Sequence, residues 1–320
     1  MDSDAIVTAA NAAESLPNTS AGKPERNSYQ VRKAIEGLIH LIFLLCGIVA
    51  VAFVLFISIY LIVSGLPAIR EIGLVKFLLG RVWDPTNTTT GAQYGILAFI
   101  LSSVYGTAGA IVVGVPVGLM TAVFLAKVAP PKLAAVIRTA VQLLAGIPSV
   151  VYGLVGMIVL VPAIRNTFSL SSGACLLAAI IVLAIMILPS IINVSETALR
   201  AVPREYEEAS LALGAAEMET YFRVSVRAAR SGIAAAVVLG VGRAIGEAMA
   251  IILVAGNVSN MPGLFTPVRF LTTGIISGMA YASPGSLYQQ ALYSIGLVLF
   301  LFIMLINLLL NVCIKNRKEG

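Results

Sequence analysis

Charged residues are scarce in this 320-residue chain, since Asp, Glu, Lys and Arg make up 11% of it and hydrophobic residues make up 59%. Soluble domains carry about 25% charged residues, so the composition excludes an ordinary soluble protein. Several apolar runs reach the ~20 residues with which a helix crosses a bilayer. The net charge of +6 is not gathered into a basic stripe with interleaved aromatic residues, so we expect no nucleic acid partner.

Cysteine and histidine are also too few for most metal or redox sites. Cys46, Cys175 and Cys313 lie far apart in apolar runs, where they form neither a CxxC motif nor an obvious disulfide framework. His40 is the only histidine. The motifs GxxxxGK[ST], HExxH and GxSxG do not occur in the sequence. We therefore expect no catalytic residue, no metal and no cofactor in this chain.

The apolar runs predict an all-α, polytopic membrane protein with six transmembrane helices. The stretch Ser64-Gly65-Leu66-Pro67 predicts the end of the first helix, and a loop follows it. Pro148 falls inside the third span, where neighbouring helices or a cavity would satisfy the freed backbone group. The predicted spans cover residues 38–63, 94–126, 133–161, 173–194, 232–255 and 287–313.

The second span carries a face of small residues, which predicts close packing of another helix against it. Its members are Ser102, Gly106, Gly109 and Ala110. A kink is expected near Pro116.

The basic residues predict the orientation of the chain. With six spans both termini share one side, and fifteen of the 21 basic residues fall on that side, against five on the other. By the positive-inside rule the termini and the loop at 195–230 are cytoplasmic. We divide the chain into a disordered cytoplasmic tail at 1–30, a first transmembrane helix with its extracytoplasmic loop at 31–92, and a core domain at 93–315.

The loop at 195–230 predicts a short amphipathic helix at about 203–216. Pro203 is suited to the first turn of a helix, and Gly214 closes it. Glu205, Glu207 and Glu208 lie near the N-terminus, where the helix dipole favours anions. Such a helix either lies on the membrane surface or is presented to a partner protein.

The fifth span contains two charged residues, Arg243 and Glu247. Arg243 lies twelve residues beyond Ser231, which is roughly 18 Å into the membrane. A central arginine costs on the order of 2.5–3.5 kcal/mol. If the helix continues, Glu247 lies one turn further on the same face, so the two residues form either a self-neutralising ion pair or part of a translocation path. We favour the path, because Arg243 can hold an oxyanion through its forked donors.

The helix at 203–216 resembles the EAA loop of ABC importer permeases. The match is Glu208-Ala209-Ser210 followed by Gly214, and Arg227 replaces a proline that is usual in that family. Four further stretches resemble the C-type permease of bacterial phosphate-specific ABC importers: FLLGRVWDP (77–85), LLAGIPSVVYGL (143–154), AVPREYEEASLALGA (201–215) and GRAIGEAMA (242–250).

The resemblance implies the type I ABC importer permease (MetI-like) fold and a subunit that moves inorganic phosphate through the bacterial cytoplasmic (inner) membrane by alternating access. The implied partners are a homologous A-type permease in a heterodimer, two cytoplasmic ATPase subunits that hydrolyse ATP, a periplasmic or lipid-anchored phosphate-binding protein, and membrane lipids. The implied residues are Arg243 and Glu247 for translocation, with Glu207, Glu208, Ala209, Ser210 and Gly214 for coupling to the ATPase. Two alternatives remain, namely another oxyanion such as molybdate or sulfate, and a secondary anion transporter without an ATPase.

Overall fold

The computed structural model describes residues 25–87 and 91–316. These residues form helices and one small two-stranded sheet, which confirms the all-α class. The chain divides into two units, residues 1–57 and 58–320, and each is described by itself. Most of the tail predicted at 1–30 lies outside the described residues. Its last six positions belong to the first helix, which begins at Glu25.

The first helix, α2 (Glu25–Ile72), runs through the stretch that was predicted to end it. The prediction was wrong because tertiary packing stabilises the helix beyond Val63. The Ser294 hydroxyl donates a 2.5 Å hydrogen bond to the Gly65 carbonyl. A Cβ atom on Gly65 would lie only 3.0 Å from the Ser294 backbone, so the glycine permits this contact. Pro67 is accommodated within the helix.

The connection after α2 is structured, although the sequence predicted a loop. It holds α3 (Leu74–Leu79) and an antiparallel pair of strands, β1 (Trp83–Asp84) and β2 (Gln93–Tyr94), in which Trp83 lies opposite Tyr94. The Trp83 ring is buried, and its centroid lies 5.4 Å from that of the Phe99 ring.

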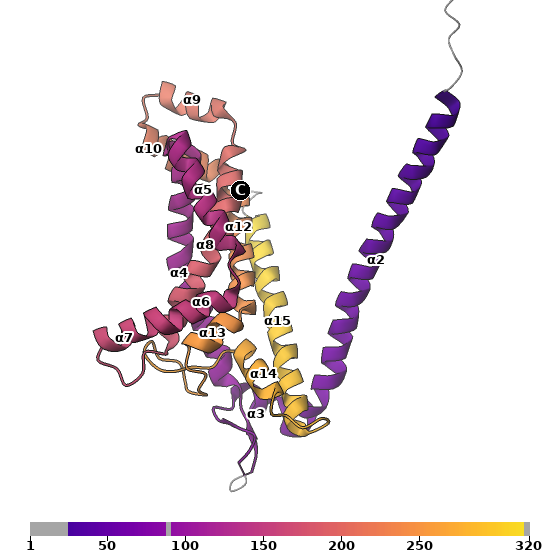
Figure 1. The fold of residues 1–320 in the computed structure, drawn as a ribbon, viewed down its shortest axis with the longest axis vertical. Helices are drawn as coiled ribbons and strands as arrows, with labels where there is room; N and C mark the ends of the chain where they lie inside the picture. Colours follow the sequence, from indigo (N-terminus) through magenta and orange to yellow (C-terminus); the bar gives the residue numbers. More distant parts are fainter. Residues whose placement is uncertain (1–24, 88–90, 317–320) are drawn as a thin grey trace, which may run out of the picture. The chain divides into compact units, whose positions relative to one another are not determined.

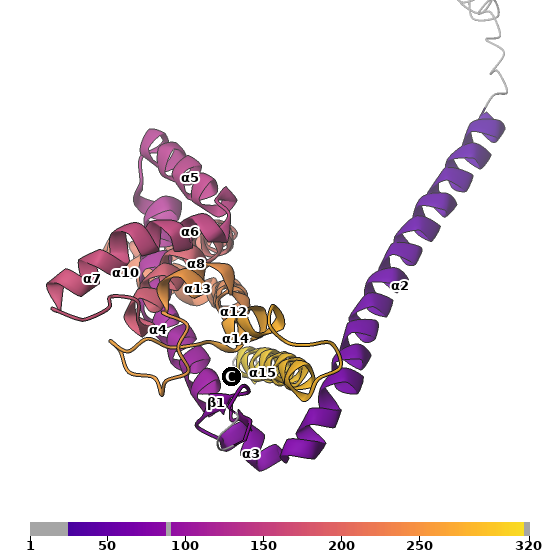
Figure 2. The same ribbon diagram turned by 60° about the horizontal axis from the view of Figure 1, so that its bottom comes forward.

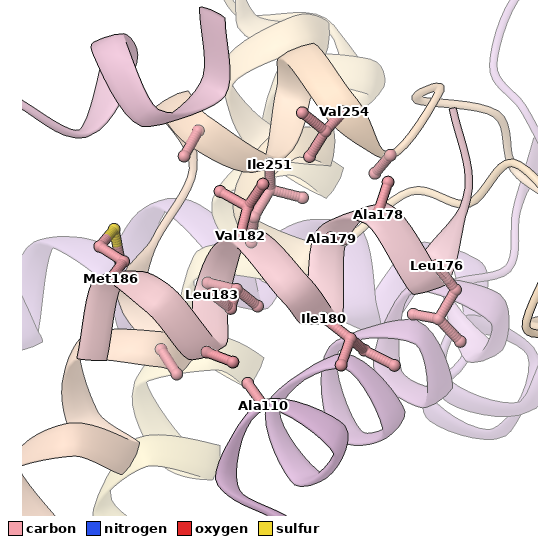
Figure 3. Close-up of a cluster of buried hydrophobic side chains, with 14 of the residues drawn as sticks. Ala110, Leu176, Ala178, Ala179, Ile180, Val182, Leu183, Met186, Ile251 and Val254 are labelled. Atoms are coloured by element: carbon pink, nitrogen blue, oxygen red, sulfur yellow. The ribbon is translucent and has the colours of Figure 1, made fainter. Parts of the chain in front are cut away.

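The core of the second unit forms around α8 (Leu176–Arg200), which packs along α4 (Leu97–Val123). The small-residue face predicted on α4 is confirmed, because a Cβ atom at Gly109 would lie 2.6 Å from the Ile180 side chain. Figure 3 shows α8 between Ala110 of α4 and the side chains of Ile251 and Val254. A π-helix at Phe124–Val128 continues α4 toward the next turn.

The predicted third span is broken at Pro148. The chain forms α5 (Pro131–Gly146), and α6 (Ser149–Val155) begins after the break. A proline lacks the N–H that a continuing helix needs and pushes the preceding residue toward extended geometry, and Ile147 has φ −70° and ψ 128°. A π-helix at Gly156–Leu160 and α7 (Val161–Thr167) follow, so the candidate span is Ser149–Thr167 instead.

The remaining elements include helix α14, which lies between the predicted fifth and sixth spans and was not predicted. Its nine residues are too short to stand out as a span. In order, these elements are α9 (Arg204–Ala212), α10 (Glu217–Thr220), a π-helix (Tyr221–Ser225), α11 (Val226–Ala228), α12 (Arg230–Gly246), α13 (Met249–Val254), α14 (Leu271–Met279) and α15 (Leu287–Asn316). Figure 1 shows α12 beside α8, and Figure 2 shows α13 close to α14.

Five helices in the described residues are long and apolar enough to cross a membrane. A sixth results if the pair Glu217–Ala228 and Arg230–Gly246, which is bent by 73°, is counted as one span. The predicted polytopic architecture is therefore confirmed, although the third and fifth spans have different boundaries from those predicted.

Candidate functional site

The predicted fifth span is interrupted at Glu247. Helix α12 ends at Gly246, and Glu247 has extended geometry with φ −73° and ψ 135°. The expectation that Arg243 and Glu247 share one face of a continuous helix is therefore wrong. Within the described residues neither side chain takes part in an ion pair.

Glu247 instead connects three helices. Its Oε1 atom accepts a 2.9 Å hydrogen bond from the Ala250 N–H in the first turn of α13. Its carbonyl accepts a 2.7 Å hydrogen bond from the Thr272 hydroxyl of α14. These contacts stabilise the break. Where the series of backbone hydrogen bonds in α12 stops, the Glu247 side chain accepts the hydrogen bond from the Ala250 N–H, which would otherwise lack an acceptor.

Arg243 lies in the last turn of α12, half-buried, and points toward α8. Its Nη1 atom donates to the Ser190 hydroxyl at 3.3 Å, which is the guanidinium's one hydrogen bond to the described part of the chain. A guanidinium has five N–H donors, so most of them remain available to an anion. A guanidinium with free donors can bind an oxyanion through forked hydrogen bonds.

A helix lies within the range predicted at 203–216, and this helix, α9, covers Arg204–Ala212. Pro203 is its N-cap residue, and Glu205 and Glu207 lie in its first turn. Gly214 follows the helix with φ +83°, a left-handed conformation that favours glycine. No residue of α9 is buried, and Leu213 beyond it is 90% exposed. Figure 1 shows α9 at one end of the bundle, next to α10.

The two adjacent carboxylates of α9 have different environments. Glu208 and Ala209 are exposed, as a docking role requires. Glu207 Oε1 instead lies 2.5 Å from Lys127 Nζ in the π-helix after α4, and it accepts a 2.7 Å hydrogen bond from Ser225. Glu207 therefore fastens α9 to its own chain. Ser210 is half-buried and forms a 2.9 Å hydrogen bond with Thr220.

A second charged cluster lies near this end of α8 and was not predicted as a site. Glu196 is 5% exposed and accepts hydrogen bonds from Arg138 at 2.7 Å and Arg200 at 2.9 Å. Both arginines also donate to the Leu125 carbonyl in the π-helix. The pair of Glu196 with Arg200 could have been predicted, because residues four apart on a helix lie on the same face. The contact of Glu196 with Arg138 could not, because the two residues are 58 positions apart in the sequence.

Residues 114–316 match the family described as binding-protein-dependent transport system inner membrane component. The chain belongs to this family. The match covers more than half of the sequence and includes Arg243 and the whole of α9.

The permease has curated relatives of similar length. It is 38% identical over 299 residues to the probable ABC transporter permease protein YqgH of Bacillus subtilis, covering 91% of this chain and 96% of the relative. It is 33% identical to the phosphate transport system permease protein PstC of Haemophilus influenzae, covering 82% and 88%. A probable PstC from Methanocaldococcus jannaschii is 30% identical, covering 85% and 91%.

The permease also resembles a solved transporter in fold. A chain from inward-facing conformations of the MetNI methionine ABC transporter aligns with a TM-score of 0.53 and 20% identity, covering 69% of this chain and 96% of that chain. This likeness supports the ABC permease fold that the sequence motifs implied.

Proposed function

We propose that this permease moves inorganic phosphate across the membrane as the translocation subunit of an ATP-driven importer. Relatives from Haemophilus influenzae and Methanocaldococcus jannaschii carry the name of phosphate transport permeases. The observation in this chain that supports anion transport is Arg243. Its guanidinium has no carboxylate partner within the described residues, and the residues between Ser231 and Arg243 on α12 are all uncharged.

In the proposed mechanism the Arg243 guanidinium attracts the anion through the donors that Ser190 leaves free. Glu247 is the second proposed residue of the path, because it lies at the break between α12 and α13. Its carboxylate caps α13, so a movement of this break would release it toward the guanidinium and help the anion leave. Alternating access would bend the chain at a position where the helix is already interrupted.

The proposed assembly contains a homologous A-type permease, two ATPase subunits and an extracytoplasmic binding protein that is periplasmic or lipid-anchored. ATP hydrolysis belongs to the ATPase subunits, and α9 would dock on them through Glu208, Ala209, Ser210 and Gly214. Glu207 would transmit the movement to the end of α4 through Lys127. This assembly requires both termini and α9 to be cytoplasmic in the inner membrane of a bacterium.

The cargo and the energy source are tested together in proteoliposomes that hold the assembled importer. Uptake of radiolabelled phosphate should depend on ATP and on the binding protein, and excess sulfate or molybdate should not compete with it. Competition by either anion would assign the permease to that oxyanion. ATP-independent uptake by the permease alone would instead indicate a secondary anion transporter.

A further inference from the structure

Helix α8 carries a row of uncharged polar side chains along one face. Ser190, Asn193 and Thr197 are spaced by three and four residues, so they lie on one side of the helix. The most apolar window of α8 is 61% buried, more than in the other candidate spans. Ser190 and Asn193 are nevertheless only half-buried, and Thr197 is exposed. We call these three residues the α8 polar row.

Two other sides of this part of α8 pack against neighbouring helices. Ile187 and Ile191 lie against glycines of α4, and a Cβ atom at Gly240 of α12 would also meet Ile191 at 3.2 Å. Ile192 packs with Ala134 of α5. With 3.6 residues per turn, the α8 polar row points away from both Ile191 and Ile192, so it lies on a third side of the helix. A face with polar groups is costly against lipid, which indicates water or another polar lining opposite it.

Arg243 reaches α8 at one end of this row. The Ser190 hydroxyl accepts the hydrogen bond from Arg243, so its own proton remains available as a donor. The Asn193 side-chain amide has no hydrogen-bond partner in the described part of the chain, and its two N–H donors lie one turn further along. The Thr197 hydroxyl donates to the Asn193 carbonyl at 2.8 Å.

We propose that the α8 polar row is the route by which an oxyanion leaves Arg243 toward the end of the bundle that carries α9. The proposal rests on the proposed function and extends the path by about 10 Å, from Ser190 to Thr197. The Ser190 hydroxyl and the Asn193 amide supply neutral donors, which suit this task because a transported ion must bind well enough to enter and weakly enough to leave. A second arginine there would hold the anion more tightly, through charge-assisted hydrogen bonds.

Accessibility of the row is measured in the full importer after Cys46, Cys175 and Cys313 have been replaced by alanine. Single variants Ser190→Cys, Asn193→Cys and Thr197→Cys are exposed to a negatively charged methanethiosulfonate reagent in inside-out vesicles. All three should react, and phosphate should slow the reaction. The control is Ile192→Cys, at the same depth but 5% exposed against α5, and it should stay unmodified.

Transport through the row is measured with Asn193→Leu and Asn193→Gln. Losing a hydrogen bond to a charged group corresponds to a rate effect of about tenfold or more, so Asn193→Leu should slow phosphate uptake per ATP hydrolysed by that factor. The amide of Asn193→Gln should restore most of it.

Unmodified row cysteines, or wild-type uptake by Asn193→Leu, would overturn the proposal. If the unaltered importer moves no phosphate, the proposed function fails. The labelling of the row relative to Ile192→Cys then still decides whether it borders an aqueous path.

Discussion

The ion pair between Lys127 and Glu207 should carry the movement of α9 into the membrane part of the permease. The two side chains are only 10% and 16% exposed, so the pair is largely shielded from water. Removing one partner of a buried pair costs about 3–5 kcal/mol, and we expect about 3 kcal/mol for Lys127→Met because both groups keep some exposure. The Ser225 hydroxyl would be the remaining partner of Glu207.

A double-mutant cycle isolates this contact. Lys127→Met, Glu207→Leu and the combined variant are compared by thermal unfolding of the purified importer and by phosphate transported per ATP hydrolysed. We expect a coupling energy on the order of 1–3 kcal/mol in stability and a loss of transport at near-normal ATP hydrolysis in both single variants.

An exposed pair of the same charge type provides the control. Arg223 and Glu219 lie 2.8 Å apart with 72% and 46% exposure, so Arg223→Met should cost less than about 1 kcal/mol and leave coupling intact. Effects of Lys127→Met and Glu207→Leu that simply add to within about 0.5 kcal/mol would refute the reasoning.

Two further predictions concern α9 and the core. Combining Glu208→Ala with Gly214→Val should abolish the stimulation of ATP hydrolysis by the loaded binding protein, because valine at φ +83° costs about 1–2 kcal/mol and the exposed carboxylate is lost. Normal stimulation in an ATPase assay would argue against docking through α9. Gly109→Leu should destabilise the permease by about 1–3 kcal/mol or more, since its side chain would overlap Ile180, whereas Gly47→Ala, with open space around it, should be neutral or stabilising in the same unfolding assay.

The apolar runs were sufficient to predict the class of fold, but not the places where helices break. Pro148 was recognised, yet an apolar sequence on both sides gave no reason to place a break there rather than a kink. Glu247 was assigned to a continuing helix because its spacing from Arg243 fits one. The break depends on its hydrogen bonds to Ala250 and to Thr272, which is 25 residues away, and such contacts have no local signature.

In the candidate site, too, features marked by neighbouring residues could be predicted, and contacts between distant residues could not. Helix α9 was predictable because Pro203 and Gly214 mark its ends in the sequence. The inward orientation of Glu207 was not, since its partner Lys127 belongs to another element. Ser190 contacts Arg243 from a position 53 residues earlier, and only the packing of α8 against α12 brings the two together.

The central claim is that Arg243 handles the transported anion, and the most direct test is phosphate uptake by the assembled importer carrying Arg243→Ala, with ATP hydrolysis measured in parallel. Arg223→Ala serves as the control on an exposed arginine. The account predicts that uptake collapses in Arg243→Ala while expression, assembly and ATP hydrolysis persist. Uptake at the wild-type rate would contradict it and would make Arg243 a structural residue.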